Sequence, residues 1–382
     1  MLKLELSGNS AYSLDLETFN ELKEAFIGAV NKDRVYLKPE EIVYLMEVRG
    51  AKLYKDGREL DIDHILRQYS DIKRFYARYA TYKDWRERGL YALTSYSLDK
   101  TVGYNIKEYS KKAIELPSGV IEVSFIKDDL ISLCKINELS ELLYNELWFG
   151  QYGNYKDSSS GMLVKYDIFE TLYLIDKGII KANYDKEAMY KSARRRHRFF
   201  DLMYNVYADW RDNGFVVKSG FKFGSNFRIY FPGIKPSDRS DNKISHSKHV
   251  LHVFPENSKL LTSEWARAIR VAHSVKKSFI LAIPQISKVK RIDIDFVLYH
   301  RDRGFTMIPN RDKASYAIYS LAEDEYIDGK LLLSIIERAK EMNLNALISI
   351  ADRESSVTYY KLKEIRISDS NNRYFEIEWM QP

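Results

Sequence analysis

The same spacing of aromatic residues recurs along the chain. Residues 75–90 read FYARYATYKDWRERGL and residues 200–215 read FDLMYNVYADWRDNGF. Steps of four, three and three residues place these rings on one helix face, and the glycine after each stripe suits a C-terminal cap. The matched positions, at a constant offset of 125, are Phe75, Tyr79, Tyr82, Trp85 and Gly89, and Phe200, Tyr204, Tyr207, Trp210 and Gly214. We expect one helical unit built twice, with each stripe in a core.

A second pair of matched patterns lies in the C-terminal half. Residues 263–283 predict a helix followed by a strand, and residues 328–350 repeat that order. A polar turn at 352–355 then leads to a further strand at 357–365. The sequence therefore predicts two α/β units that follow the helical ones.

These patterns divide the chain into five parts of mixed α/β or α+β character. Strands mixed with helices over units of this size favour separate α/β domains rather than one large sheet. The expected parts are a first helical unit (1–95), a linker (96–118), a second helical unit (119–214), an α/β domain (215–304) and a second α/β domain (305–382).

Composition indicates a globular protein with a moderate positive charge. The 382 residues are 45% apolar and 30% charged, which excludes a largely disordered chain. A net charge of +6 favours a polyanionic partner, although a solvated basic surface explains it equally well. The 29 tyrosines suit both a core and a surface on which bases stack.

The cysteine count and the lengths of the apolar runs exclude several classes of protein. Cys134 is the only cysteine, so neither an internal disulfide nor a thiolate metal cluster can form. The N-terminal residues lack the apolar core of a signal peptide, and no run approaches the ~18–20 apolar residues of a membrane span. We expect a soluble, cytoplasmic protein with no membrane partner.

Three segments near the middle of the chain carry candidate chemistry. Tyr230 lies in a predicted strand, His246 just before another, and Lys277 at a predicted helix end. A phenol, an imidazole and an ammonium are sufficient to cut RNA without a metal ion. One base takes the proton of the ribose 2′-hydroxyl, one acid protonates the departing 5′-oxygen, and a cation balances the crowded phosphate.

Strand alternation predicts how two of these side chains lie. Phe227, Ile229 and Phe231 share one face, so Arg228 and Tyr230 are expected on the other, away from the apolar side. A phenol with a pKa near ~10 is a poor base at neutral pH, so a cation has to assist it. His246 precedes its strand and is expected to be exposed, where an imidazole suits a general acid.

A metal site is the competing interpretation of the histidines. His246 and His252 share a strand face, whereas His249 points the other way, so the three cannot converge on one ion. With no companion cysteine, we expect no metal and no other cofactor.

The three segments resemble a known family. GFKFGSNFRIY (220–230), HSKHVLHVFPE (246–256) and RVAHSVKKSFILA (270–282) closely resemble the catalytic domain of archaeal tRNA-splicing endonucleases, with the strongest resemblance over 200–283. The flanking units look like partial copies, as in the fused three-unit form, which is expected to act as a homodimer. The resemblance implies metal-independent cutting of precursor tRNA introns at bulge–helix–bulge sites, with 2′,3′-cyclic phosphate and 5′-hydroxyl ends.

The resemblance also implies residue roles. Tyr230 corresponds to the general base, His246 to the general acid and Lys277 to the stabilising cation, with Lys276 as the other candidate lysine. A departure from the family is the longer connection at 233–243, which has the character of an inserted surface loop. The C-terminal unit has no counterpart of the histidine or the lysine and is expected to be inert.

Further contacts follow from the resemblance. Arg270, seven residues before Lys277, matches an arginine that clamps a bulged base, and Arg301 is the candidate for the second one. Lys156, in the polar loop 150–161, is a third candidate RNA contact. In the inert unit, Asp352 and Glu354 occupy the turn where the family carries acidic residues that dock into a basic pocket of a neighbouring unit.

Two alternatives remain open. The run 193–198, ARRRHR, is either a solvated helix face or a phosphate contact. The protein as a whole could also be a non-catalytic RNA-binding or scaffolding subunit of a splicing complex. The complete set of Tyr230, His246 and Lys277 argues against that alternative, because an inert copy is expected to lose part of it.

Overall fold

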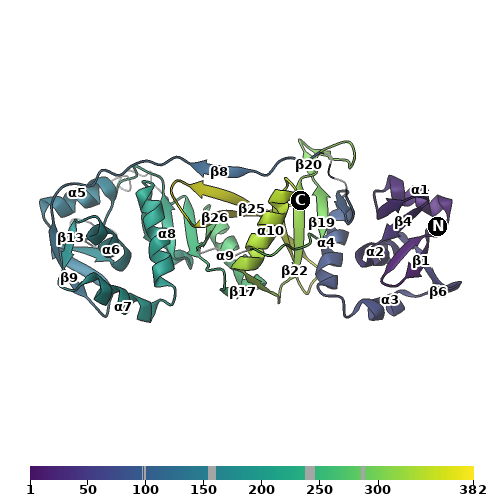
Figure 1. Ribbon diagram of the computed structural model, residues 1–382, viewed down its shortest axis with the longest axis horizontal. Coiled ribbons are helices and arrows are strands. Elements are labelled where there is room, and N and C mark those ends of the chain that lie inside the picture. The colour runs from purple at the N-terminus through teal and green to yellow at the C-terminus, as the bar shows by residue number, and fades with distance from the viewer. Residues whose placement is uncertain (97, 99, 154–160, 237–245, 285–288) are drawn as a thin grey trace.

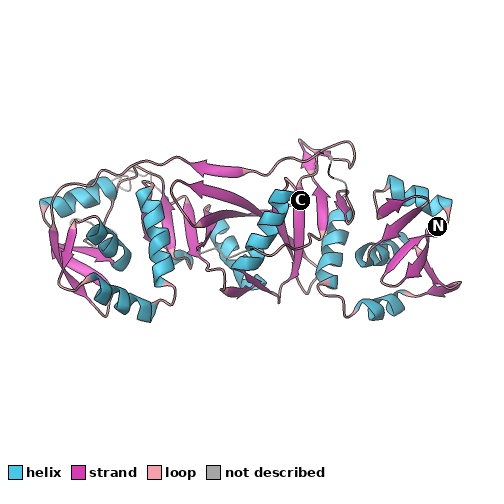
Figure 2. Ribbon diagram, in the orientation of Figure 1, coloured by secondary structure: helices cyan, strands magenta, loops and turns pink. Residues whose placement is uncertain are grey.

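The computed structural model describes residues 1–382 except 97, 99, 154–160, 237–245 and 285–288. The molecule is elongated, with a small domain of helices and strands at each end and a long sheet between them (Figure 1, Figure 2). This architecture confirms the predicted mixed α/β, α+β class.

The first end domain contains a six-stranded sheet with the order β3-β4-β2-β1-β5-β6. Its strands are β1 (Lys3–Ser7), β2 (Ser10–Ser13), β3 (Ala29–Asn31), β4 (Arg34–Leu37), β5 (Lys52–Lys55) and β6 (Arg58–Leu60). Its helices are α1 (Leu16–Glu24), α2 (Pro39–Arg49), α3 (Ile62–Tyr69) and α4 (Phe75–Glu87).

The second end domain repeats this plan with a five-stranded sheet of order β11-β12-β10-β9-β13. Its strands are β9 (Ile121–Ile126), β10 (Ile131–Lys135), β11 (Gln151–Tyr152), β12 (Leu163–Asp167) and β13 (Ile180–Ala182). Its helices are α5 (Glu138–Leu147), α6 (Ile168–Asp176), α7 (Lys186–Arg196) and α8 (Phe200–Asp212).

The duplicated aromatic stripe forms equivalent helices, α4 and α8, as predicted. Trp85 and Trp210 are both fully buried, and the glycines that follow, Gly89 and Gly214, have φ values of 71° and 88°. A positive φ is strained for residues with a Cβ atom, which explains why each stripe ends in glycine.

The prediction of separate domains instead of one large sheet is wrong. A single 11-stranded sheet has the order β14-β15-β16-β18-β26-β25-β24-β22-β19-β7, and β8 pairs with β25 outside this path. The strands are β14 (Val216–Ser219), β15 (Phe227–Tyr230), β16 (His249–Val253), β18 (Ser278–Ile283), β26 (Arg373–Met380), β25 (Val357–Ile367), β24 (Asn345–Ala351), β22 (Tyr316–Ala322), β19 (Phe296–Tyr299), β7 (Tyr91–Leu93) and β8 (Ile106–Tyr109).

The join between β18 and β26 makes the sheet continuous. These strands are antiparallel, with Phe279 opposite Ile377 and Ile283 opposite Arg373. Without this pairing each would be an edge strand with unpaired backbone groups, so their pairing satisfies both edges at once. Helices α9 (Thr262–Ser274) and α10 (Gly329–Glu341) pack on this sheet. Two short antiparallel ribbons lie outside it. One pairs β17 (Lys259–Leu261) with β23 (Tyr326–Asp328), and the other pairs β20 (Arg301–Asp302) with β21 (Phe305–Thr306).

The two ends of the chain pack together to form a second complete unit. Strand β7 pairs with β19, and helix α4 packs on β22 and β24. One hydrophobic core joins Leu4 and Tyr82 to Leu298, Leu347 and Tyr359. The first end domain therefore covers the half of the sheet that contains β22 and β19, as the second end domain covers the other half. The divisions at 95, 118, 214 and 304 themselves stay predictions.

Among the described residues, no helix combines the length and the apolar character that a membrane crossing requires.

Candidate active site

The sheet topology brings the three candidate segments to one edge. Strand β15 ends at Tyr230, antiparallel β16 begins three residues after His246, and β18, parallel to β16, begins directly after Lys277. In this ladder His249 is the register partner of both Ile229 and Ser278. The end of β15 and the beginnings of β16 and β18 therefore lie side by side.

Tyr230 is buried, which corrects the expectation that it faces away from the apolar side. Its exposed fraction is 3%, whereas that of Phe231 is 41%. The Tyr230 ring lies 4.9 Å, centroid to centroid, from the ring of Trp148 at the end of helix α5. Alternation along β15 cannot reveal this contact, because Trp148 comes from the other domain.

Arg228 lies beside Tyr230 and was not assigned a role from the sequence. Its Nη1 donates to Tyr230 Oη at 3.2 Å, and its Nε donates to the Ser219 carbonyl at 2.7 Å. The two side chains share a strand face at positions i and i+2, which is the signal that could have identified Arg228.

Lys277 points into the same edge. Helix α9 ends at Ser274, Lys276 is exposed with a φ of +55°, and the buried Lys277 Nζ donates to the Ser247 carbonyl at 2.7 Å. Burial, and secondarily the charge of Arg228, lower the pKa of Lys277. Of the two candidate lysines, Lys277 is therefore the one whose side chain is buried at this edge.

His246 is exposed, as expected, and directly precedes Ser247, whose carbonyl holds Lys277. Two contacts lie at this edge: Arg228 donates to the Tyr230 hydroxyl, and Lys277 donates to the carbonyl of Ser247, the residue after His246. The charge of Arg228 is close enough to act on Lys277. The arrangement offers a phenol, an imidazole open to solvent, and two cations at one strand edge.

The other two histidines of this segment have different surroundings. His249 is fully buried, and its Nε2 lies 2.9 Å from Tyr109 Oη. His252 is half-buried and stacks on Phe279 at a centroid distance of 6.5 Å. Within the part of the chain that the structure describes, no group of three or more His, Cys, Asp or Glu side chains is arranged to hold a metal ion.

The predicted RNA contacts are not gathered at this edge. Arg270 is exposed on α9, and its charge acts on the hydroxyl of Tyr360. Arg301 Nη2 donates to the Arg88 carbonyl at 2.7 Å, and β19 lies five strand positions from β18, roughly 24 Å away at the usual strand spacing. Lys156 lies outside the described residues.

The acidic turn lies between β24 and β25, in the half of the molecule that the first end domain covers. Asp352 Oδ1 accepts from the backbone N–H groups of Glu354 and Ser356 at 2.9 Å and 2.8 Å, while the Glu354 side chain is exposed. Tyr76 on helix α4 donates to Ser355 Oγ at 3.1 Å. The turn is therefore held by its own backbone and by the first end domain.

Comparison with known proteins shows the family to which the chain belongs. The family model for the tRNA intron endonuclease catalytic C-terminal domain matches residues 200–293. The tRNA-splicing endonuclease of Methanosarcina barkeri is 25% identical over 354 residues, covering 77% of this chain and 99% of that relative. The tRNA-splicing endonuclease of Thermococcus gammatolerans is 38% identical over 140 residues (34% of this chain, 78% of the relative). That of Methanopyrus kandleri is 35% identical over 155 residues (39% and 81%).

Residues 200–293 contain all three candidate catalytic side chains together with Arg228. The match to the Methanosarcina barkeri protein covers 77% of the chain and so extends well beyond residues 200–293. The chain is an endonuclease and belongs to the tRNA-splicing endonuclease family.

Proposed function

We propose that this enzyme removes introns from precursor tRNA by internal transesterification. The ribose 2′-oxygen attacks the adjacent phosphorus, the bond from phosphorus to the 5′-oxygen breaks, and the products end in a 2′,3′-cyclic phosphate and a 5′-hydroxyl. The observation that carries this proposal is that one sheet edge holds the Arg228–Tyr230 hydrogen bond and the hydrogen bond from Lys277 to the Ser247 carbonyl, directly beside His246. The proposed substrate also implies that the enzyme acts in the cytoplasm.

Each group has one task in this reaction. Tyr230 takes the 2′-hydroxyl proton, and Arg228, which donates to the same phenol oxygen, balances the negative charge left there. His246 gives a proton to the departing 5′-oxygen, and its exposure leaves it accessible to the substrate. Lys277 stabilises the additional negative charge on the phosphorus-bound oxygens.

The test uses purified protein and an intron-containing precursor tRNA. His246→Ala is expected to retain RNA binding and to lose roughly 10²–10⁴-fold in cleavage rate, because a proton donor is removed. His64→Ala, which removes an exposed histidine of helix α3, is the matched control and is expected to cleave normally. EDTA is expected to leave the rate unchanged. Wild-type cleavage by His246→Ala, or loss of activity in EDTA, would refute the mechanism.

Recognition of a bulge–helix–bulge fold suits this surface, because RNA is often read by its shape and by splayed bases. We assign Arg270, exposed on α9, to a stacked base. Since Arg301 is remote from this edge in its own chain, a clamp using both guanidinium groups requires two chains. Arg270→Ala should lower cleavage of bulged substrates, and an unchanged KM and kcat would remove the arginine from the clamp.

A homodimer is also supported by charge complementarity. A groove of about 630 Å³ between the second end domain and the catalytic half of the sheet is lined by Arg196, His197, Arg198 and Lys259, and its lining, as far as the structure describes it, includes no carboxylate. The turn with Asp352 and Glu354 supplies the opposite charge. Helix α7 ends at the groove, and helix α4 contacts the acidic turn. These two helices lie in opposite halves of the molecule (Figure 1), so the turn must reach the groove of a second chain.

Light scattering tests this docking. Asp352→Lys with Glu354→Lys is expected to yield monomers, because the turn then repels the basic groove. Asp302→Lys, in the exposed hairpin β20–β21, is the control and should leave the dimer mass unchanged. A dimer mass that survives the double change would exclude the groove as the docking site.

A further inference from the structure

The residues between the two end domains form a strap over the central sheet. Strand β8 runs parallel to β25, with Lys107 in register with Ile365 and Tyr109 with Ile367. Figure 1 shows β8 along one side of the sheet, between the end domains. We call residues 106–112 the linker strap. It is backbone-paired where the sequence predicted only a connection.

The strap is also in close contact with the end of helix α8. Lys112 N donates to the Asn213 carbonyl at 3.3 Å, and a Cβ atom on Gly214 would lie only 2.3 Å from the Lys112 carbonyl oxygen. At the matching Gly89 a Cβ atom would meet nothing within 4 Å. Gly214 therefore has two roles: it adopts the positive φ of the turn and leaves room for the strap. Gly89 is required only for the positive φ of its turn.

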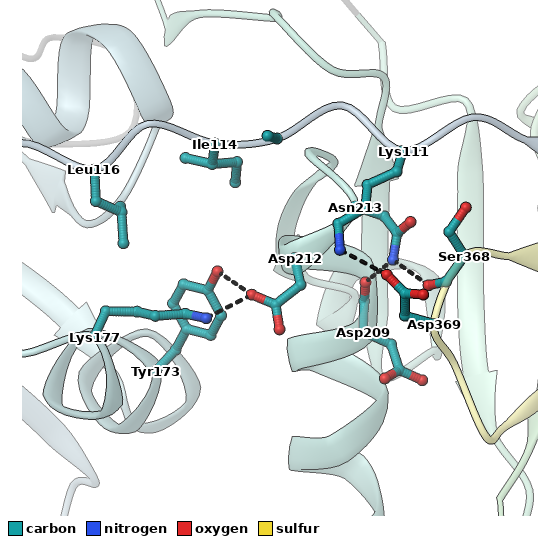
Figure 3. Close-up of a pocket in the computed structure, with 11 residues that line it drawn as sticks. Lys111, Ile114, Leu116, Tyr173, Lys177, Asp209, Asp212, Asn213, Ser368 and Asp369 are labelled. Atoms are coloured by element: carbon teal, nitrogen blue, oxygen red, sulfur yellow. Dashed lines mark hydrogen bonds and ion pairs between the residues drawn. The ribbon is translucent and has the colours of Figure 1, made fainter.

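Next to this contact, Lys111 of the strap and the residues that follow it, Ala113, Ile114 and Leu116, form one wall of a cavity of about 420 Å³ (Figure 3). Lys111 Nζ pairs with Asp369 Oδ2 at 2.7 Å, and Asn213 Nδ2 donates to the Ser368 carbonyl at 3.0 Å. These contacts connect the strap, helix α8 and the turn between β25 and β26.

Tyr109 is the residue of the strap that reaches toward the catalytic edge. Its ring packs edge-on against Phe215 at 5.3 Å and against Phe231, the neighbour of Tyr230, at 6.1 Å, measured between centroids. It also lies 6.2 Å from Trp210, the last ring of the duplicated stripe. The ring is thus held on several sides by aromatic side chains of the catalytic unit.

The hydroxyl of Tyr109 holds His249. Its Oη lies 2.9 Å from His249 Nε2, while His249 Nδ1, also buried, has no hydrogen-bond partner among the described residues. Tyr109 is therefore the polar contact that sets the orientation of this imidazole. Because His249 is paired in register with Ile229 and Ser278, its placement affects the strands that carry Tyr230 and Lys277.

The contact joins two neutral groups at neutral pH. Burial lowers the pKa of His249 to about 4, with Glu376 opposing and the charges of Lys107 and Lys248 adding to the effect. Burial likewise raises the pKa of Tyr109. The hydrogen bond does not depend on a charge that titrates near pH 7.

Lys107 makes a second connection to the same edge. Its Nζ lies 3.2 Å from Glu376 Oε2 on strand β26. Burial opposes the charge of Glu376, but a hydrogen bond from Ser278 and the ammonium of Lys107 hold the pKa of this carboxyl below its usual value. Through Glu376 the strap is connected to Ser278, the neighbour of Lys277.

We propose that the linker strap is a clamp on the catalytic edge and that Tyr109 is a positioning residue for the reaction. It contacts Phe231 beside Tyr230, orients His249 in the strand that follows His246, and reaches the neighbour of Lys277 through Lys107 and Glu376. The inference rests on the proposed function, because it assigns the strap a role in cleavage and not in RNA binding.

Steady-state and single-turnover cleavage of a precursor tRNA test the clamp. Tyr109→Phe removes one hydroxyl and keeps the ring, so the fold should persist. We expect kcat to fall roughly tenfold with KM and the thermal midpoint unchanged, because a small displacement of reacting groups is costly. Tyr104→Phe is the matched control, since Tyr104 lies in the same linker and its hydroxyl donates to Glu364 Oε2 at 3.2 Å, away from this edge.

Nuclear magnetic resonance of ¹⁵N-labelled histidine gives a readout that needs no RNA. The Nε2 resonance of His249 is expected to shift in Tyr109→Phe and to stay in place in Tyr104→Phe. In a double-mutant cycle, His249→Phe should add little to the loss caused by Tyr109→Phe, because both remove the same contact.

The outcomes separate the two proposals. A wild-type protein that cuts no precursor tRNA refutes the proposed function. A wild-type protein that cuts, with Tyr109→Phe as fast as Tyr104→Phe, refutes the clamp alone. A loss of kcat that merely follows a fall in the thermal midpoint also overturns the clamp, because it would report stability instead of positioning.

Discussion

Arg74 and Asp295 form a nearly buried, two-bond ion pair, although 221 positions separate them along the chain. Arg74 Nη1 and Nη2 donate to the two Asp295 oxygens at 2.8 Å and 3.1 Å, and Asp295 Oδ2 also accepts from Ser320 N at 2.7 Å. In the catalytic unit the equivalent backbone contact is made by a neutral residue, since Asn226 Oδ1 accepts from Val253 N at 2.7 Å.

The equivalence follows from position, because Asn226 directly precedes β15 and Asp295 directly precedes β19. Asn226 and Val253 line the open basic groove, whereas in the second unit the guanidinium of Arg74 occupies the matching place and stacks 3.8 Å from the Tyr319 ring centroid. The ion pair joins the first end domain to the half of the sheet that contains β19, so its removal tests how these two parts are held together.

Arg74→Ala is expected to lower the free energy of unfolding by about 3–5 kcal/mol, because it leaves the Asp295 carboxylate buried without its counter-charge. Arg49→Ala removes an exposed ion pair with Glu21 and should cost about 1 kcal/mol or less. Urea denaturation of both variants compares the two costs. Equal midpoints would show that the buried pair does not hold the two ends of the chain together.

Gly214→Ala is expected to destabilise the protein more than Gly89→Ala does. Both positions have positive φ, so each substitution carries a backbone cost of about 1–2 kcal/mol. Only at Gly214 does the new Cβ atom also collide with the Lys112 carbonyl. The difference in thermal midpoint should therefore measure the strap contact, and protease cleavage after Lys111 or Lys112 should become faster in Gly214→Ala alone. Equal effects at the two glycines would argue against close packing of the strap.

Stability should fall as pH rises from 5 to 8, in part because of Glu41. This fully buried carboxyl accepts from the backbone N–H groups of Gly28 and Lys38, and burial raises its pKa to about 7 from 4.5. Between pH 5 and about 7 the folded protein keeps this proton while the unfolded chain has released it, so the rise in pH costs the folded state about 3 kcal/mol by pH 8.

Glu41→Gln removes the titrating group and keeps its shape. The loss of stability between pH 5 and pH 8, measured by urea denaturation, should be smaller in this variant by about the same amount. Parallel pH curves for the variant and the wild type would show that Glu41 stays ionised when folded.

Arg228→Ala is expected to reduce the cleavage rate by roughly 100-fold with RNA binding preserved, because one preorganised donor beside the phenol is lost. Removal of this neighbouring charge also raises the pKa of Lys277 toward its usual value. Arg228→Lys should restore part of the activity, since it returns a charge without the forked geometry. Arg267→Ala, exposed on α9, is the control, and a similar loss there would point to a general effect of surface charge.

The spacing of residues along the chain was sufficient to predict several helices and strands of this molecule. The stripe that contains Trp85 and its duplicate at Trp210 predicted helices α4 and α8, and the alternation ending at Tyr230 predicted β15. The exposure of His246, just before its strand, was also correct. These features depend on residues a few positions apart, and the periods of helices and strands are set by the same short-range geometry.

Tertiary structure alone decided how the units meet. The β18–β26 pairing that turns two expected domains into one sheet, and the Trp148 ring that buries Tyr230, both join segments more than 80 positions apart. The strap contact between Tyr109 and His249 is of the same kind. An unpaired strand edge or an exposed ring face can be covered by many partners of similar chemistry. The local sequence therefore indicates that a partner is needed. Only the packing of the whole chain selects which segment becomes that partner.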